Sequence, residues 1–383
     1  MAVKIKKKEI NKSFDFILLI VVLLLLGLGI IMVLSASSPS SLATNGSSYT
    51  FVIKQAIAAG LGIIGMMVIS RIDYKIYSKY AKILYLISFV LLLMVLIPGV
   101  GIRMNGARRW IRVPIFGSLQ PSEIAKMGII IFFASYLSKN KKDLKGLWGG
   151  FLKPIIFYAA PPLCVILLIQ SHLSASVIIV LVVSLMMIVA GCRLRYFLSF
   201  GTAGATLGIT VMYFLAKFKG MGSFRLQRIT SFLNPWADPQ NTGWQIIQSL
   251  YAIGSGGLFG VGLGNSRQKY LYISEPHNDF IFAVLAEELG FVGCAFVIIL
   301  FAMFIWRGVL ISMKAPDMFG SLLAIGITAL IGFQAIINIA VVTSSMPVTG
   351  MALPFFSYGG TSLIILLSAV GILLNISRQT EKL

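Results

Sequence analysis

Long apolar stretches alternate with short polar connections along almost the whole chain. A helix needs about 20 predominantly apolar residues to cross a bilayer, and tilt accommodates stretches that depart from this length. Ten stretches fit this pattern: residues 14–35, 51–69, 82–97, 121–137, 155–169, 173–191, 196–216, 280–306, 320–344 and 361–376. The pattern predicts an all-α polytopic membrane protein with about ten transmembrane helices in a single integral domain, residues 1–383.

Composition excludes a soluble fold. Of the 383 residues, 58% are hydrophobic and only 11% are charged. The first apolar stretch follows a basic start, as in a signal peptide, but it is too long for one and lacks a convincing cleavage site. We therefore predict a retained first helix. Cys164, Cys192 and Cys294 lie in apolar segments without paired spacing, which indicates packing residues rather than a disulfide or a thiolate metal site.

The distribution of Lys and Arg predicts the orientation. With the N-terminus inside, 20 of the 32 basic residues fall in the tails and inner connections, and 10 fall in outer connections. Because cytoplasmic loops carry the excess of Lys and Arg, both termini are predicted to be cytoplasmic, as a basic tail 1–13 and a short tail 377–383. The same rule explains the net charge of +20, with affinity for anionic membrane lipid. Nucleic-acid binding is not predicted.

The outer connection 97–123 departs from that rule, since it carries Arg103, Arg108, Arg109 and Arg112. Cations outside predict an anionic ligand, and in a membrane protein the phosphate head of a lipid is the natural candidate. The next span opens with Pro121, which favours a helix start, and places Glu123 and Lys126 on one helical face. This pair is either a structural ion pair or part of a site that organises the anionic ligand.

The largest outer connection, residues 217–278, is too long for a plain connector, so function is expected there. Within it, residues 244–259 are apolar but too short and glycine-interrupted to cross, which predicts an interfacial or re-entrant segment. The following GVGLGNS resembles a nucleotide-binding glycine loop, but no βαβ pattern surrounds it. We expect a flexible turn near the membrane surface instead.

Three acids mark the eighth span. Asp279 stands at its outer mouth beside His277 and Asn278, where a carboxylate either caps the helix or performs chemistry. Glu287 and Glu288 lie about 12 Å deeper at 1.5 Å per helical residue. Ionisable groups at such depth are costly, so they are either functional or paired structurally, with Gln334 or Asn338 on the ninth span as candidate partners.

Several motifs together resemble one family. NGARRWI at 105–111, LQPSEIAK at 119–126, NPWADPQNTGWQ from residue 234, EPHNDFIFAVLAEELGFVG from 275 and PVTGMALPFFSYGGTS from 347 occur in order over nearly all ten spans. They are similar to the SEDS family of cell-wall polymerases, in particular its division and sporulation branch, FtsW and SpoVE, with RodA as the nearest alternative.

The resemblance implies a peptidoglycan glycosyltransferase that joins lipid II units at the outer face of the bacterial cytoplasmic membrane, during division or sporulation and at the septum. Asp279 matches the family's essential acid and would accept the proton of the acceptor 4-hydroxyl. Undecaprenyl pyrophosphate would leave, stabilised by outer cations, with Arg108 and Arg109 as first choices. A divalent cation, Mg²⁺ or Mn²⁺, would arrive with the pyrophosphate, and no organic cofactor is implied.

The remaining candidate substrate-binding residues also follow from the resemblance. Glu123 and Lys126 match positions that shape the same cavity, His277 and Asn278 adjoin the acid, and Ser357 lies in a motif near the outer ends of the last two spans, where packing is the alternative role. One departure is the Gln-Pro-Asp signature after the fifth span. Here the chain has Gln170, Ser171 and His172, so the role of that aspartate cannot be carried over.

The family also implies partners: undecaprenyl-pyrophosphate-linked glycan as the growing strand, a class B penicillin-binding protein as transpeptidase, and other divisome or sporulation proteins. Two other function classes stay open at this stage. A lipid II flippase would need a path across the bilayer, for which the charges of Glu287, Glu288 and Lys126 could be recruited. A scaffold that recruits a synthase would not need the intact Asp279.

Overall fold

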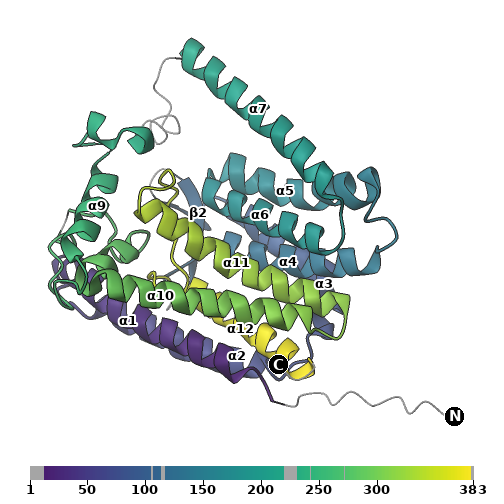
Figure 1. Cartoon of the computed structure of the whole chain (residues 1–383), viewed down its shortest axis with the longest axis horizontal. Helices are drawn as coiled ribbons and strands as arrows, with labels where there is room; N and C mark the ends of the chain where they lie inside the picture. Colours follow the sequence, from purple (N-terminus) through teal and green to yellow (C-terminus); the bar gives the residue numbers. More distant parts are fainter. Residues whose placement is uncertain are drawn as a thin grey trace.

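The structure is a computed structural model that describes residues 13–104, 107–113, 117–219, 231–241, 243–270 and 272–380. Most of its helices run roughly along one axis, and α9 (Trp244–Gly256) stands across it (Figure 1). Most of the basic tail 1–13, residues 220–230, 242 and 271 of the large outer connection, and residues 381–383 of the C-terminal tail lie outside the described residues. The boundaries predicted for these segments are therefore untested there.

The described chain is mostly helical, as predicted. The long helices are α1 (Phe16–Asn45), α2 (Thr50–Ile69), α3 (Lys75–Met94), α4 (Pro121–Lys139), α6 (Leu173–Val189), α7 (Leu194–Lys219), α9 (Trp244–Gly256), α10 (Ile281–Met313), α11 (Met318–Val342) and α12 (Gly360–Gln379). The fifth predicted span is a composite of η1 (Leu147–Leu152), η2 (Ile155–Ala159), α5 (Ala160–Cys164) and η3 (Val165–Ile169), and a short η4 covers Pro235–Ala237. Every predicted span coincides with a helical segment.

Seven described helices are long and apolar enough to cross a membrane by length and composition: Phe16–Thr44, Thr50–Ile69, Lys75–Met94, Leu147–Ile169, Ile281–Met313, Met318–Val342 and Gly360–Gln379. Leu173–Val189 is a shorter apolar helix. The chain is thus a multi-pass membrane protein, and the number ten stays a prediction. The composite segment combines wide π turns with the short α5, and it contains Pro154, Pro161 and Pro162, which lack the N–H that an unbroken α-helix requires.

The arginine-rich connection forms a small sheet, which the sequence analysis did not anticipate. Strands β1 (Gly101–Met104), β2 (Ala107–Val113) and β3 (Gly117–Leu119) pair antiparallel in the order β1-β2-β3. Ile111 in β2 is opposite Gly101 on one side and Leu119 on the other. Because β3 ends two residues before α4, the sheet sets where Glu123 and Lys126 enter the bundle.

Small residues and buried polar contacts hold the helices together. A Cβ at Gly62 of α2 would lie 2.4 Å from the Leu367 side chain of α12, so the glycine permits close helix packing.

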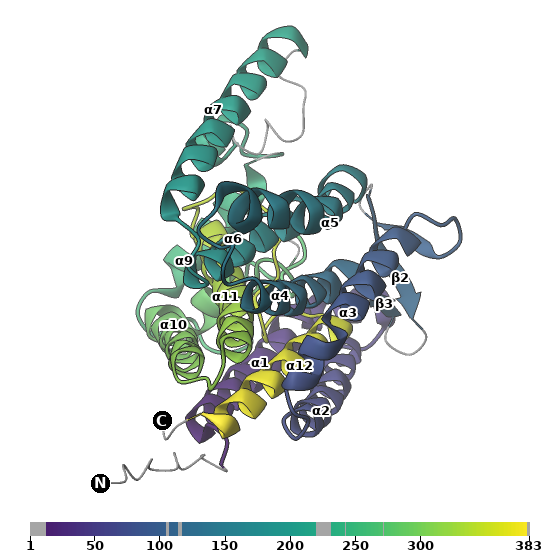
Figure 2. The same cartoon turned by 90° about the vertical axis from the view of Figure 1, so that its right-hand side faces the viewer.

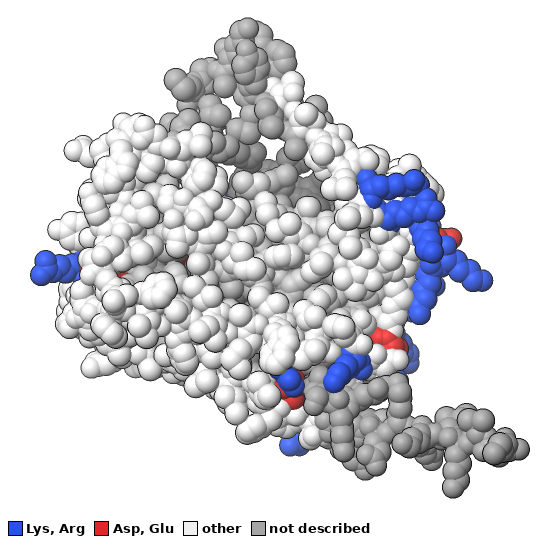
Figure 3. Space-filling view, viewed as in Figure 1, with Lys and Arg blue, Asp and Glu red and all other residues white. Residues whose placement is uncertain are grey.

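Helix α11 is buried along most of its length between α4, α6 and α10, and α7 extends away from the other helices in both views (Figures 1 and 2). On the face in Figure 3, basic side chains gather at the right-hand end.

Two ends of the chain meet in one ionic cluster. The Asp15 carboxylate at the N-cap of α1 accepts from the Arg307 guanidinium, with Oδ2 2.8 Å from Nε and 2.6 Å from Nη2. The Asp15 amide donates to Ser377 Oγ of α12 at 3.0 Å. Helix α12 continues to Gln379, so the first residues of the predicted C-terminal tail 377–383 are helical. The starts of α1 and the end of α12 therefore lie at the same end of the bundle.

Candidate active site at the outer end of the bundle

The turn 277–279 before α10 is held by its backbone carbonyls. Asn338 Nδ2 of α11 donates to the Asp279 carbonyl at 2.8 Å and to the Met351 carbonyl at 2.5 Å. Ser357 Oγ donates to the Asn278 carbonyl at 2.7 Å, and the Tyr358 amide donates to the His277 carbonyl at 2.9 Å. The N-cap residue of α10 is Phe280. The backbone of the turn is thus held by α11 and by the loop that precedes α12. These hydrogen bonds use the carbonyls of the turn and not its side chains.

The loop 343–359 supplies most of these contacts. Ser357 Oγ also accepts from the Leu353 amide at 2.7 Å, and Gln55 of α2 brackets the end of the loop, accepting from the Gly359 amide at 3.1 Å. Gly350 has φ +69°, and a Cβ built there would lie 3.2 Å from Asp279 Oδ2. The carboxylate of Asp279 therefore lies against a backbone position that only glycine occupies without strain.

His277 is buried beside the same turn. Its ring lies 4.8 Å from the Phe51 ring and 5.9 Å from the Tyr358 ring, and its Nε2 is 3.6 Å from the exposed Glu275 carboxylate. Burial lowers the pKa of His277, and the Glu275 charge opposes that shift only in part. At neutral pH the imidazole is uncharged, so it is a packing and hydrogen-bonding group rather than a cation for phosphate.

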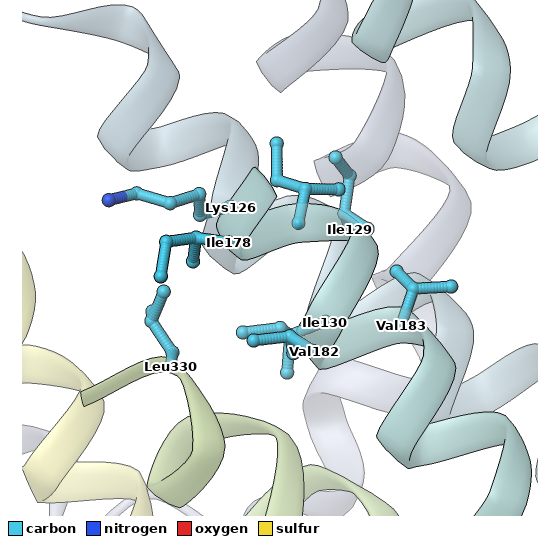
Figure 4. A pocket seen from close by; sticks show the side chains of 8 residues that line it. Lys126, Ile129, Ile130, Ile178, Val182, Val183 and Leu330 are labelled. Atoms are coloured by element: carbon cyan, nitrogen blue, oxygen red, sulfur yellow. The ribbon is translucent and has the colours of Figure 1, made fainter. Parts of the chain in front are cut away.

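Glu123 and Lys126 form the predicted ion pair. Lys126 Nζ is 2.7 Å from Glu123 Oε1, with side chains only 4% and 14% exposed. Beneath the ammonium the wall is apolar: Ile178 of α6 and Leu330 of α11 lie beside the Lys126 stem in Figure 4. The pair thus places a fixed polar group between α4, α6 and α11.

Arg109 and His172 lie near this pair. Arg109 Nε donates to the Gln170 carbonyl at 2.9 Å and its Nη2 donates to the Ser171 carbonyl at 2.7 Å, which ties β2 to the connection before α6. His172 Nδ1 is 3.2 Å from Gln120 Nε2. Burial, and then the charges of Arg109 and Lys126, lower the pKa of His172 to about 3. The segment Gln170-Ser171-His172, which stands in place of the family's Gln-Pro-Asp signature, is therefore neutral and tightly held beside two cations.

One hydrogen bond joins the two groups of residues. Ser174 Oγ at the start of α6 donates to the Thr349 carbonyl, and Thr349 precedes the glycine that faces Asp279. Within the described part of the chain, five buried polar atoms on or next to the residues of these two groups have no hydrogen-bond partner: Ser122 Oγ, Gln170 Oε1, His277 Nδ1, Asn338 Oδ1 and Thr349 Oγ1. Buried polar atoms are normally paired, so unpaired ones mark a place where a polar ligand or water completes the network.

The other predicted cations are placed differently. Arg108 and Arg112 are exposed on β2, and among the described contacts none joins either of them to the turn 277–279. The side chain of Arg103 lies outside the described residues. Arg109 is committed to two carbonyls, a role that the sequence analysis did not foresee. The structure thus brings Arg109, Glu123 and Lys126 together and leaves Arg108 on the surface of the sheet.

The structural pairing proposed for Glu287 and Glu288 has other partners than predicted. Glu287 accepts from Ser266 Oγ at 2.5 Å and from the Arg267 amide at 2.9 Å, all in the large outer connection. Glu288 accepts from Lys269 Nζ at 3.0 Å and from Ser35 Oγ of α1 at 2.6 Å. Gln334 and Asn338 are not their partners, because α10 turns these carboxylates toward α1 and the outer connection. Asn338 instead holds Asp279.

The segment predicted as interfacial or re-entrant is helix α9 followed by a glycine turn. Gly260, Gly262 and Gly264 all have positive φ, and the turn is bonded to α10: the Val261 amide donates to the Glu287 carbonyl at 3.0 Å. The expected turn is therefore present, and it is anchored on α10 by backbone hydrogen bonds.

No dedicated metal centre is built into the described residues, since no three His, Cys, Asp or Glu side chains gather there into a group that could hold an ion. The residues around Asp279 therefore do not by themselves fit a resident divalent cation.

A bundle of apolar helices with buried charged and polar side chains at one end defines a multi-pass membrane protein with a polar site near the membrane surface. The chain belongs to the FtsW/RodA/SpoVE family, described as Cell cycle protein, whose pattern matches residues 16–382.

Curated relatives cover nearly the full chain. It is 46% identical to Stage V sporulation protein E of Bacillus subtilis (strain 168) over 354 residues, 91% of this chain and 93% of the relative. It is 43% identical to the probable peptidoglycan glycosyltransferase FtsW of Geobacter metallireducens (strain ATCC 53774 / DSM 7210 / GS-15), covering 99% of this chain and 98% of the relative.

Solved structures share the fold. A chain of a peptidoglycan synthase complex that coordinates polymerization and crosslinking matches with a TM-score of 0.78 and 28% identity, over 96% of this chain and 98% of that one. The rod shape determining protein RodA of Thermus thermophilus matches with a TM-score of 0.69 and 27% identity, over 97% and 98%.

Proposed function

We propose that this protein is a peptidoglycan glycosyltransferase that polymerises lipid II at the outer face of the cytoplasmic membrane. Full-length relatives named as probable peptidoglycan glycosyltransferases support the activity. The observation that carries the site is the Asp279 carboxylate against Gly350, on a turn whose three carbonyls are all held by neighbouring residues. Such a fixed carboxylate is suited to receive a proton from a bound hydroxyl.

In the proposed step, the 4-hydroxyl oxygen of the acceptor sugar bonds to C1 of the donor strand while the bond from C1 to the pyrophosphate oxygen breaks. The hydroxyl proton passes to Asp279, and undecaprenyl pyrophosphate leaves with the bonding electron pair. Negative charge grows on the leaving group, so nearby cations stabilise the transition state. None of the described contacts uses the guanidinium donors of Arg108, so all of them can bind the leaving group. Arg109 uses two of its donors to position the segment before α6.

The residues around this carboxylate have distinct proposed roles. Glu123, Lys126, His277, Asn278 and Ser357 bind or orient the polar part of the substrate, with Ser357 acting through the Asn278 carbonyl. A divalent cation, Mg²⁺ or Mn²⁺, would supply further charge neutralisation for a bound pyrophosphate. We derive no step through it, because the described residues provide no dedicated ligand set.

The cellular setting follows the family. We propose cytoplasmic termini, septal action in division or sporulation, and a class B penicillin-binding protein as the partner that crosslinks the new strands. The predominance of Lys and Arg in the connections assigned to the inside supports the orientation. The match to a chain of a peptidoglycan synthase complex supports a partner of this class.

The test is polymerisation of purified lipid II by the reconstituted protein and its partner synthase, whose transpeptidase is blocked. Wild type is compared with Asp279→Ala, Asp279→Asn and, as an exposed-acid control, Asp143→Asn. Glycan ladders should form with wild type and the control and vanish with both folded Asp279 variants. Ladders that survive Asp279→Asn would remove the proposed base. Lipid II transfer across liposomes without ladders would favour a flippase, and neither activity would favour a scaffold.

A further inference from the structure

Two ionic clusters mark two levels along the same pair of helices. Helices α1 and α10 pack side by side (Figure 1). At one level Asp15 of α1 pairs with Arg307 of α10, and at the other Ser35 of α1 bonds to Glu288 of α10. Ser35 lies 20 residues after Asp15, and Arg307 lies 19 residues after Glu288. At 1.5 Å per residue α1 gives about 30 Å between the levels, and the part of α10 beyond its kink at Gly290 gives about 25 Å from Gly290 to Arg307.

That spacing equals the hydrocarbon thickness of a bilayer, about 30 Å. Between the two levels α1 is almost wholly apolar, whereas beyond Ser35 it continues as ASSPSSLATN, rich in serine. Charged and polar clusters are expected where the acyl chains end, because unpaired charge inside the chains is costly. The outer boundary of the hydrocarbon therefore runs at the level of Ser35 and Glu288.

The glycine turn lies at this outer boundary. We call residues 257–263 the apolar loop. Its backbone is bonded to α10 at the boundary level: the Gly262 amide donates to the Glu288 carbonyl at 3.1 Å, and the Val292 amide donates to the Leu258 carbonyl at 3.1 Å. The buried Lys269, paired with Glu288 at 3.0 Å, fixes the chain that follows. The loop therefore cannot lie far above or below this level.

The side chains of the apolar loop point outward. Leu258 is 64% exposed, Phe259 is 81% exposed and Leu263 is 55% exposed. This exposed surface continues onto Phe291 and Val292, where the outward face of α10 begins. A patch that is continuous with a lipid-facing helix, and that lies where the acyl chains end, matches the chemistry of the membrane interface.

A positive charge beside the apolar loop also indicates that membrane lipid covers this surface. Arg267, three residues after the last glycine of the turn, is exposed, and its amide is bonded to Glu287 at the boundary level. A guanidinium there can reach the phosphate of a phospholipid while the loop contacts the first acyl carbons.

We propose that the apolar loop inserts into the outer leaflet between headgroups and acyl chains, with Arg267 on a lipid phosphate. The Asp279 turn lies near the same boundary, because Gly359, at the end of the loop that holds the turn, precedes Ser377 by 18 residues of α12, or about 27 Å, and Ser377 bonds to Asp15. The apolar loop is thus an interfacial anchor that fixes the level of the site relative to the membrane.

The test uses single cysteines carrying an environment-sensitive fluorophore, in a background with Cys164, Cys192 and Cys294 replaced by alanine. Phe259→Cys is compared with Ala43→Cys, on α1 beyond the boundary, and with Ile299→Cys, on the outward face of α10 about 16 Å below Glu288. The protein is reconstituted in vesicles of phosphatidylethanolamine and phosphatidylglycerol. Spin-labelled lipids then quench at the headgroup, at a shallow acyl position or at a deep one.

The fluorophore at position 259 should be quenched at least twofold more by the shallow label than by the deep one, that at 299 the reverse, and that at 43 by neither acyl label. Arg267→Gln should at least halve quenching at 259 by headgroup-labelled phosphatidylglycerol. Quenching at 259 that matches position 43 overturns the proposal. So does protection from water that arises only when the partner synthase is added, since the patch would then be a protein interface. The measurement needs no polymerase activity, so its outcome is separable from the proposed function.

Discussion

The pair of Lys269 and Glu288 gives a sharp prediction about stability. The side chains are 3% and 0% exposed, and Lys269 Nζ contacts Glu288 Oε1 at 3.0 Å, the Gly264 carbonyl at 2.6 Å and Ser35 Oγ at 3.1 Å. Lys269→Met removes the only described cation that contacts Glu288 and leaves a buried carboxylate with hydroxyl and amide donors alone. Breaking a buried pair in this way costs about 3–5 kcal/mol.

The reciprocal change should cost less. In Glu288→Gln the ammonium keeps the Gly264 carbonyl and Ser35 Oγ as acceptors, so we expect a loss of about 1–3 kcal/mol. The double variant Lys269→Met with Glu288→Gln removes both charges and should be more stable than Lys269→Met alone. The double variant should therefore lose less stability than the sum of the two single losses, which shows that the two sites are coupled.

The assay is reversible unfolding of the purified protein in mixed micelles at increasing mole fraction of denaturing detergent. Lys54→Met, an exposed lysine on α2, is the matched control and should stay within about 0.5 kcal/mol of wild type. A loss below about 1 kcal/mol for Lys269→Met, or a double variant that is less stable than both single ones, would refute the reasoning.

Three further predictions concern the site. Gly350→Ala should lower polymerisation at least tenfold, because the new Cβ lies 3.2 Å from Asp279 Oδ2 at φ +69°, whereas Gly46→Ala, with φ +68° and no atom within 4 Å, should leave the rate of the folded protein unchanged; equal rates for both variants would contradict this. Burial holds the pKa of His172 near 3, below its ordinary value of 6.5, so the unfolded state binds an extra proton between these values and the protein should lose stability as the pH drops from about 6.5 toward 3. His172→Gln should flatten the pH dependence of the unfolding free energy over that range. An unchanged pH dependence would show that another group titrates. Asn338→Leu should reduce kcat by about tenfold or more with little change in KM, since it frees the Asp279 carbonyl without touching the cations; a pure rise in KM in lipid II titrations would contradict a positioning role.

Helix positions followed from the sequence because apolar runs in a membrane protein have one dominant explanation. Each predicted span has a helical counterpart, and the Glu123–Lys126 pair has the predicted spacing and contact. The sheet of residues 101–119 was missed, since its short strands carry arginines and glycines rather than an alternating apolar pattern. The predicted partners of Glu287 and Glu288 were wrong because the position of a residue along a helix does not determine which neighbouring element its side chain faces.

The polar framework of the site was only partly predictable. Asp279 stood out as an acid at a helix mouth, but Asn338, Gln55 and Gln170 act through backbone carbonyls and amides far away in sequence. A signal was present, since amide side chains inside apolar spans are rarely idle. Assigning their partners required the folded arrangement of α2, α11 and the loop 343–359.

The ionic cluster of Asp15 and Arg307 has a consequence for the order of assembly during synthesis. Asp15 caps the first helix, yet its carboxylate is neutralised by Arg307 of α10 and its amide is satisfied by Ser377, near the end of the described chain. Until these segments leave the ribosome, the start of α1 carries an unpaired carboxylate at the membrane surface. The first helix to be inserted is therefore among the last to be locked, and truncation before α12 should leave a nascent chain that is threaded through the membrane but not closed.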